Sequence, residues 1–443
     1  MLLTSKIIDE LLDNKFEIDF PVLRLTQMSH EPKKVFSGPG SISQDSNGGL
    51  RLKLYLTYDS PEQFHQDFRD EFARPQLPPG KIIPESKYFS LAGMDMHGRE
   101  WFADRVWASG DLSMPAQGRI IRAKVNDLTS TTKLEHTPGK QRKIHFGVST
   151  LVDLPWNDRD VSEKSISRSR FTVAVEDGPI SVTKLDRYTS ISISVPEIEN
   201  PNDYATCIID SISFATGYYL QPFFESWNDG SVIRTTLFSR RDIHRADRFL
   251  PALPQISLTY SDDLADFVRT FSKLGKNRHS LAAGYWYRIY SAYGGNIENQ
   301  ALVLSTAIEG LLKAYFKDLG KPDADFVAQV QEFQSALDEI KVGDRVKQRV
   351  RSSLSNALSQ TSKSALHALE TSGSIPKHLI PIWNRLRNQS AHADELNMDD
   401  STLQKLLDDV HGCLELFIRL VALASNYSGA LVQYSQPSWP STK

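Results

Sequence analysis

The chain has 443 residues, of which 40% are hydrophobic and 24% are charged, and its net charge is −3. One hydrophobic core rarely serves a chain of this length, so we expect roughly two or three domains, and the composition excludes a disordered or fibrous protein. A protein that coats nucleic acid carries a strong basic excess, which this chain lacks. Any contact with RNA or DNA is therefore expected at a small local site, as in an enzyme that acts on a nucleic acid.

The cysteines and the N-terminal residues narrow the class of protein further. Cys207 and Cys413 lie far apart in apolar runs, and two isolated thiols cannot form a disulfide framework or a four-ligand zinc site, so we expect both to be buried. Acidic residues interrupt the first ten positions, which argues against a signal peptide. No window approaches the roughly 20 apolar residues of a membrane span. These features predict a cytoplasmic protein with no membrane partner.

Residues 1–250 have the pattern of a β-rich domain. Apolar and polar residues alternate in several short segments, as they do in half-buried strands, at 16–20, 50–58, 143–151, 170–175 and 190–195. One helix is expected at about 203–224, after Pro201 and Asn202. The pattern predicts a sandwich or a barrel-like sheet with few helices.

Residues 251–443 have a helical pattern, and Pro251 and Pro254 mark the junction. Apolar residues at helical spacing predict helices at 263–275, 279–293 and 301–315. Weaker helices are expected between 323 and 372, with breaks at Gly343 and Gly373. We therefore expect an α+β multidomain protein in which an all-α bundle follows the β-rich domain.

The last helix has the clearest pattern. Its apolar residues repeat at spacings of four and three, which predicts one seam against a partner helix, at Leu403, Leu407, Val410, Leu414, Phe417 and Val421. Asp399, Asp400 and Ser401 are suited to cap its first turn.

The residues that suggest chemistry lie just before this helix, in a shorter helix expected at about 381–393. Asn388 and His392 are four positions apart and share a face if the helix continues, and Arg387 lies one position to the side. These side chains suit RNA cleavage, in which the ribose 2′-hydroxyl attacks the adjacent phosphate without a metal or an enzyme nucleophile. Histidine can transfer protons near neutral pH, arginine can hold phosphate oxygens with two donors, and asparagine can orient the histidine.

Spacing alone does not identify such a site. Arg24 and His30 match the pattern loosely within an expected strand region and are set aside. The alternative for Arg387 and His392 is a solvated helix end at which both side chains bind water or cap carbonyl groups.

Other polar groups carry less information. Asp95-Met96-His97 and Asp203 do not form a recognisable metal or nucleophile set. The basic cluster 240–245 is better explained as a solvated loop than as a nucleic-acid contact.

The order of elements supports a resemblance. The segment 387–392, Arg-Asn-Gln-Ser-Ala-His, resembles the Arg-polar-(x)n-His motif of HEPN domains, with Asn388 at the polar position. The expected helix at 301–312 resembles the acidic helix of that family, and a long amphipathic helix follows the motif. The resemblance covers about residues 260–430, and the layout resembles the ApeA-like subgroup, in which a β-rich domain precedes the HEPN domain.

This resemblance implies a metal-independent endoribonuclease of bacterial anti-phage defence (abortive infection) that needs no cofactor. HEPN proteins generally build the cleft across a homodimer, with His392 as the proton-transfer residue, Arg387 as the phosphate stabiliser and Asn388 assisting. Glu309, by analogy alone, would orient one of these groups. The implied partners are an RNA substrate such as tRNA and a phage-derived trigger, sensed by the N-terminal domain.

Other interpretations stay open at this point. The helical part could be a non-catalytic HEPN module that binds RNA or a protein partner. It could also be an antitoxin-associated subunit, although the large fused β-rich domain argues against that. Glu309 could simply flank an amphipathic helix.

Overall fold

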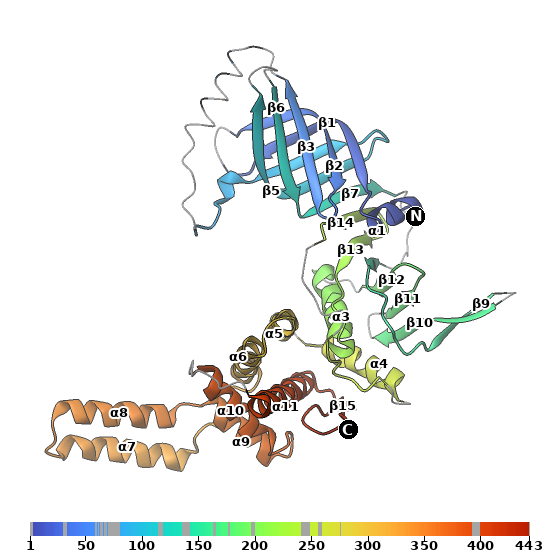
Figure 1. Ribbon diagram of the computed structural model, residues 1–443. Coiled ribbons are helices and arrows are strands. Elements are labelled where there is room, and N and C mark those ends of the chain that lie inside the picture. The colour runs from blue at the N-terminus through green and yellow to red at the C-terminus, as the bar shows by residue number, and fades with distance from the viewer. Residues whose placement is uncertain are drawn as a thin grey trace. The chain divides into compact units, whose positions relative to one another are not determined.

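A computed structural model describes the chain except for residues 1–2, 30–32, 58–59, 61, 63–64, 66–68, 70–79, 114–117, 135–141, 163–164, 176–177, 196–199, 241–248, 256–258, 275, 392–398 and 443. The chain forms two compact units (Figure 1). The first contains Met1–Pro201 and Leu220–Ile243, and the second contains Asn202–Tyr219 and His244–Lys443.

Six strands of the first unit form a sheet that closes on itself. They are β1 (Glu17–Gln27), β2 (Val35–Gln44), β3 (Leu50–Thr57), β4 (Phe89–Met94), β5 (Glu100–Ser113) and β6 (Gly118–Val125). Their order is β1-β2-β3-β6-β5-β4, and β4 pairs with β1 as well as with β5, which completes the ring (Figure 1). Of the two arrangements expected from the sequence, this is the barrel-like one.

The remaining strands extend the sheet from β5. In order of pairing they are β7 (Asp127–Lys133), β14 (Val232–Phe238), β13 (Pro222–Asn228), β8 (Lys143–Val148), β12 (Thr189–Ser194), β11 (Gly178–Lys184), β10 (Ser165–Val175) and β9 (Asp158–Ser162). Each alternating segment noted in the sequence coincides with a strand. A short helix, α1 (Ser5–Leu12), and a 3-10 turn, η1 (Glu85–Lys87), accompany the sheet and were not predicted.

Alternation determines which side chains fill the closed sheet. In β3 the leucines at 50, 52, 54 and 56 are buried, whereas Lys53 and Tyr55 are exposed on the other face. Successive residues of a strand point to opposite faces, so one sequence supplies both the core and the outer surface. The interior is completed by large apolar side chains such as Phe20, Leu23, Trp101 and Val106.

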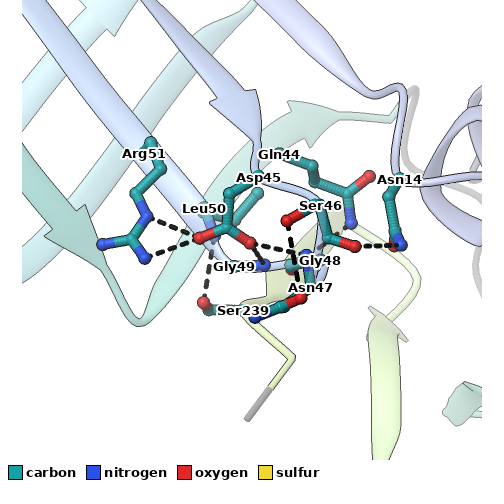
Figure 2. Close-up of polar contacts among 10 residues, drawn as sticks. All are labelled: Asn14, Gln44, Asp45, Ser46, Asn47, Gly48, Gly49, Leu50, Arg51 and Ser239. Atoms are coloured by element: carbon teal, nitrogen blue, oxygen red, sulfur yellow. Dashed lines mark hydrogen bonds and ion pairs between the residues drawn. The ribbon is translucent and has the colours of Figure 1, made fainter. Parts of the chain in front are cut away.

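In two hairpins of this unit, an aspartate carboxylate accepts the hydrogen bonds that hold the turn. The Asp45 carboxylate accepts hydrogen bonds from the backbone N–H groups of Asn47 (3.0 Å) and Gly49 (2.8 Å) and from the Arg51 Nε (2.6 Å), as Figure 2 shows. In the turn between β4 and β5, Asp95 accepts from the backbone N–H groups of His97 (2.8 Å) and Arg99 (2.9 Å) and from another donor, the Trp101 Nε1 (3.0 Å). The Asp95-Met96-His97 pattern is therefore a hairpin turn.

The second unit is mainly helical, with α3 (Pro201–Thr216), α4 (Tyr260–Phe271), α5 (Lys276–Tyr293), α6 (Ile297–Tyr315), α7 (Ala324–Glu339), α8 (Asp344–Leu358), α9 (Ser362–Thr371), α10 (Leu379–Ala391) and α11 (Asp400–Ser425). Two short strands, β15 (Leu431–Val432) and β16 (Ser441–Thr442), pair near the C-terminus. The helices predicted from the sequence are present, including the breaks at Gly343 and Gly373.

Two helix ends were predicted wrongly, and the first is that of the helix expected at 263–275, which ends at Phe271. The helix expected at 203–224 ends at Thr216, because Gly217 takes a positive φ of 76° that stops the helix. Pro222–Asn228 is instead the strand β13 of the first unit.

α11 is more deeply buried than one seam requires. The expected seam residues Val410, Leu414, Phe417 and Val421 are buried, and so are residues of the other faces, such as Leu416 and Leu420. Because α11 contacts α4, α6 and α10, apolar residues surround its middle. The predicted cap is confirmed, with the Asp399 side chain accepting from the Thr402 N–H at 2.7 Å. Both cysteines are buried, as expected.

Candidate functional site

Packing against α11 and α6 fixes the position of α10, which carries Arg387. Leu379, Trp383 and Leu386 are buried on one face of α10. Ile382 lies against Gly412 of α11, where a Cβ atom would lie only 2.9 Å from the Ile382 Cδ1 and Cγ2. Glycine at 412 therefore allows the two helices to approach closely.

An ion pair fixes the rotation of α10 beside α11. The Arg385 Nη2 lies 2.5 Å from one oxygen of Asp409, and its Nε donates to the other oxygen at 3.1 Å. The Asp409 carboxylate is buried, and this two-point contact raises the pKa of Arg385. Arg385 is thus a positioning residue, two positions before Arg387.

Arg387 contacts Glu309 across the gap between α10 and α6. The Arg387 Nε donates to the Glu309 Oε1, and the Lys313 Nζ lies 3.9 Å from the Glu309 Oε2. The Arg387 guanidinium also lies over the Trp383 ring, 5.9 Å from its centroid. Two of the residues selected from the sequence, 78 positions apart, are therefore neighbours.

A cavity of about 410 Å³ opens beside this pair. Its lining combines three cationic side chains, one carboxylate and several neutral polar groups, and consists of Glu309, Leu312, Lys313, Gln360, Thr361, Ser362, Lys363, Ala365, Trp383, Asn384 and Arg387. Thr361 caps α9, whose first turn forms one wall. Cations and a helix N-terminus together favour an anionic ligand.

The other two selected residues are placed less fully. Asn388 is exposed on α10, next to Arg387. His392 lies outside the described residues, directly after Ala391, the last residue of α10. Whether it shares a face with Asn388 therefore stays a prediction.

Comparison with family models, with curated proteins and with solved structures finds no match to this chain.

Sequence reasoning missed several residues around Arg387. Lys313 lies one helical turn after Glu309, so its position beside that residue was predictable from spacing. Asp409 is a charged residue inside the apolar pattern of α11, which is a signal of a buried partner. No sequence pattern pointed to Lys363, because only tertiary packing brings α9 to the cavity.

A second polar group involves His378, Ser435 and Glu415, but its order argues for a structural role. The Ser435 hydroxyl lies 2.9 Å from the His378 Nε2 and donates to Glu415 at 2.6 Å. In a Ser-His-acid triad the histidine lies between serine and acid, whereas here the serine does. This chain of contacts ties the C-terminal segment to α11 and to the residues before α10.

Among the residues that the structure describes, the remaining polar candidates do not form a further site. Arg240 contacts the Leu11 carbonyl (3.3 Å) and the Asn14 side chain (3.4 Å), and the rest of its cluster lies outside the described residues. Arg24 lies in β1, and His30 is not among the described residues. In the described part of the chain, no three His, Cys, Asp or Glu side chains are grouped to hold a metal ion, and no helix combines the length and apolar character needed to cross a bilayer.

Proposed function

We propose that the helical unit is a metal-independent endoribonuclease of the HEPN type, and that the whole chain resembles the ApeA-like proteins of anti-phage defence. The observation that carries the proposal is the contact between Arg387 and Glu309 beside the cation-lined cavity. It supports the proposal because the resemblance to HEPN domains implies a role for both residues in one site, and an arginine held by a carboxylate beside a cation-lined cavity is suited to bind a phosphate.

The chemistry requires a base, an acid and an anion stabiliser. The 2′-oxygen of a ribose attacks the adjacent phosphorus, a new P–O2′ bond forms, and the P–O5′ bond breaks. The 2′-hydroxyl proton passes to a base and the 5′-oxygen gains a proton, which leaves a 2′,3′-cyclic phosphate and a 5′-hydroxyl. His392 is assigned the proton transfer, because histidine changes charge near neutral pH.

Arg387 is assigned the phosphate. Glu309 engages the Nε, and the two terminal nitrogens of the guanidinium carry the donors that would bind a phosphate in the cavity that Arg387 lines. Arginine held in this way needs little reorganisation when negative charge develops on the phosphorane. Glu309 is then a positioning residue, and Asn388 assists from the next position of α10.

A second copy of the chain and a phage-derived trigger belong to the same proposal. HEPN cleavage sites generally pair two motifs, so a homodimer would place a second Arg387 and His392 across the cleft. The β-rich unit is assigned the sensing of the trigger, and the setting is the cytoplasm of a bacterium.

The test compares RNA cleavage by purified variants. Wild-type protein, Arg387→Ala and His392→Ala are incubated with tRNA and other RNAs in EDTA, with and without phage lysate. We expect the wild type to cleave and to leave cyclic phosphate ends. Cleavage by His392→Ala should be slower by about 10²–10⁴-fold, the range of a lost general acid–base group, and Arg387→Ala should also lose cleavage.

Two variants of the same unit serve as controls. Arg351→Ala removes an exposed arginine that also contacts an aspartate, Asp338, and His367→Ala removes an exposed histidine. Both should cleave like the wild type. Cleavage that survives in Arg387→Ala and His392→Ala would refute the proposed site, and RNA binding without cleavage under all conditions would favour a non-catalytic RNA-binding module.

A further inference from the structure

Four cationic side chains crowd the outer face of the closed sheet in the first unit. Arg51 and Lys53 of β3 lie opposite Lys124 and Arg122 of β6 in the strand register. Neighbouring strands are about 4.8 Å apart and alternate residues of a strand about 6.7 Å apart, so the Cα atoms of the four residues mark the corners of a small rectangle. We call Arg51, Lys53, Arg122 and Lys124 the basic square.

The basic square carries an electrostatic cost. Like charges directly opposite each other in a sheet destabilise it, and the chain as a whole has a net charge of −3. Asp45 pairs with Arg51 of this group as part of the β2–β3 turn (Figure 2). Four cationic side chains grouped on one face of a chain whose net charge is −3 form a local surface suited to an anionic ligand.

Two exposed aromatic rings lie on the same face. Trp107 of β5 is opposite Lys124 and is 57% exposed, and Tyr55 of β3 follows Lys53 on the same side of its strand and is 46% exposed. A groove of about 510 Å³ lies over this face, lined by Arg51, Leu52, Lys53, Trp107, Ser109, Arg122, Ala123 and Lys124. Cations and one of the two rings therefore line one shallow groove.

A β-bulge turns Trp107 outward. In β5, Trp101 and Ala103 point into the core, and strict alternation would place Trp107 there as well. The register with β4 shifts between Phe89 and Leu91, Arg105 takes a positive φ of 56°, and the next inward residue is Val106. This conformation is strained for a residue with a Cβ, and bulges of this kind re-aim side chains near functional sites.

We propose that this face binds single-stranded nucleic acid. Phosphates would pair with the basic square while unstacked bases stack on Trp107 and Tyr55, which is how sequence-tolerant single-strand binding works. A duplex keeps its bases stacked inside and offers Trp107 nothing to stack on. This proposal is independent of the cleavage site, which lies in the other unit.

The test measures the binding of a fluorescent oligothymidylate of about 20 nucleotides to the full-length protein by anisotropy, over a range of salt concentrations. This DNA has no 2′-hydroxyl, so the proposed ribonuclease chemistry cannot cleave it. Trp107→Ala should weaken binding roughly fivefold to a hundredfold with an unchanged salt slope, because it removes stacking alone. Lys53→Ala with Lys124→Ala should weaken binding and reduce the slope of log K against log salt by about 1.4.

Matched controls separate this surface from general effects. Phe102→Ala removes an aromatic residue that is 43% exposed on the same strand, and Lys15→Ala with Lys133→Ala removes two exposed lysines of the same unit. Neither should change binding. The proposal is overturned if the oligothymidylate does not bind, if duplex DNA binds equally well through the same residues, or if Trp107→Ala and Phe102→Ala have the same effect. Weaker binding to oligouridylate than to oligothymidylate would still support it, with DNA as the preferred strand.

Discussion

Three arginines of the helical unit each contact a carboxylate on a neighbouring helix, namely Arg385, Arg387 and Arg351. The three carboxylates differ in how deeply they are buried. The side chain of Asp409 is 6% exposed, that of Glu309 is 24% exposed and that of Asp338 is 64% exposed. When the arginine is removed, a buried carboxylate stays out of contact with water and its desolvation still costs free energy. An exposed carboxylate is solvated again and loses little. We therefore expect Arg385 to serve stability, and Arg387 to be available for a ligand at little cost to the fold.

Arg385→Ala should lower the free energy of unfolding by about 2–4 kcal/mol, because it leaves the Asp409 carboxylate buried and unpaired. Arg351→Ala and Arg387→Ala should each cost under about 1 kcal/mol, as exposed or partly exposed pairs do. Urea titrations followed by circular dichroism of the purified variants measure all three. Equal losses in Arg385→Ala and Arg351→Ala would show that burial of the carboxylate is not what matters.

The sequence could supply part of this site and not the rest. Arg387 could be predicted from its motif, and Glu309 from the resemblance of its helix to the acidic helix of HEPN domains. Both residues lie beside apolar helical stripes, which determine which faces of α6 and α10 meet. Their role in catalysis stays a prediction. The cavity could not be anticipated, because Lys363 reaches it from α9 through packing between segments that share no local pattern.

Among the structural elements, the two aspartate turns show how a hairpin can depend on charge. Burial raises the pKa of the Asp95 carboxyl, but hydrogen bonds from the Trp101 indole and from the backbone N–H groups of Arg99 and His97 outweigh it, so the pKa lies below its ordinary value. Burial also raises the pKa of Asp45, and the Gly49 N–H and Arg51 contacts again lower it overall. In both turns the ionised carboxylate is the form that the folded hairpin stabilises.

The lowered pKa of Asp95 makes the stability of the first unit depend on pH. Because the folded-state pKa of Asp95 lies below the unfolded value of about 3.9, its contribution to stability is complete at neutral pH and is lost as the pH falls below about 4. Asp95→Asn cannot ionise, so the difference in unfolding free energy between the wild type and this variant should shrink from pH 7 to pH 3. Urea unfolding monitored by tryptophan fluorescence tests this, and a difference that stays constant over that range would contradict it.

Strand positions were predictable where alternation was regular, as in Leu50, Leu52 and Leu54 of β3. The bulge in β5 was not, because no local pattern marks Arg105 as the residue with a positive φ where the register with β4 shifts. The consequence is functional as well as structural. Strict alternation along β5 would place Trp107 in the interior of the sheet. The observed bulge instead places it on the outer face with the basic square.

At the scale of the whole molecule, α3 packs with a different unit from the one that flanks it in the sequence. It lies in the sequence between strands of the first unit, yet Asn202–Tyr219 belongs to the second. The Phe214 ring stacks on that of Phe267, with centroids 5.6 Å apart, and lies 6.0 Å from Phe417 and 6.3 Å from Trp286. These partners lie 53 to 203 positions further along the chain, and no local pattern predicts such contacts. A division at residue 250 would separate α3 from them.

The helical unit should therefore fail to fold when it is expressed as residues 251–443 alone. Five buried apolar residues of α3, Cys207, Ile208, Ile209, Ile212 and Phe214, would be missing from its core. At roughly 1.5–3 kcal/mol for each large side chain, their loss approaches the whole stability of a typical domain, about 5–15 kcal/mol. We expect this fragment to lack a cooperative thermal transition and to bind a hydrophobic dye, and we expect a peptide of residues 201–219 to restore the transition. In the full-length chain, Phe214→Ala should cost about 3–5 kcal/mol. A cooperative transition of the fragment without the peptide would show that the helices form a core independently of α3, and a division near residue 250 would then describe the folding units better.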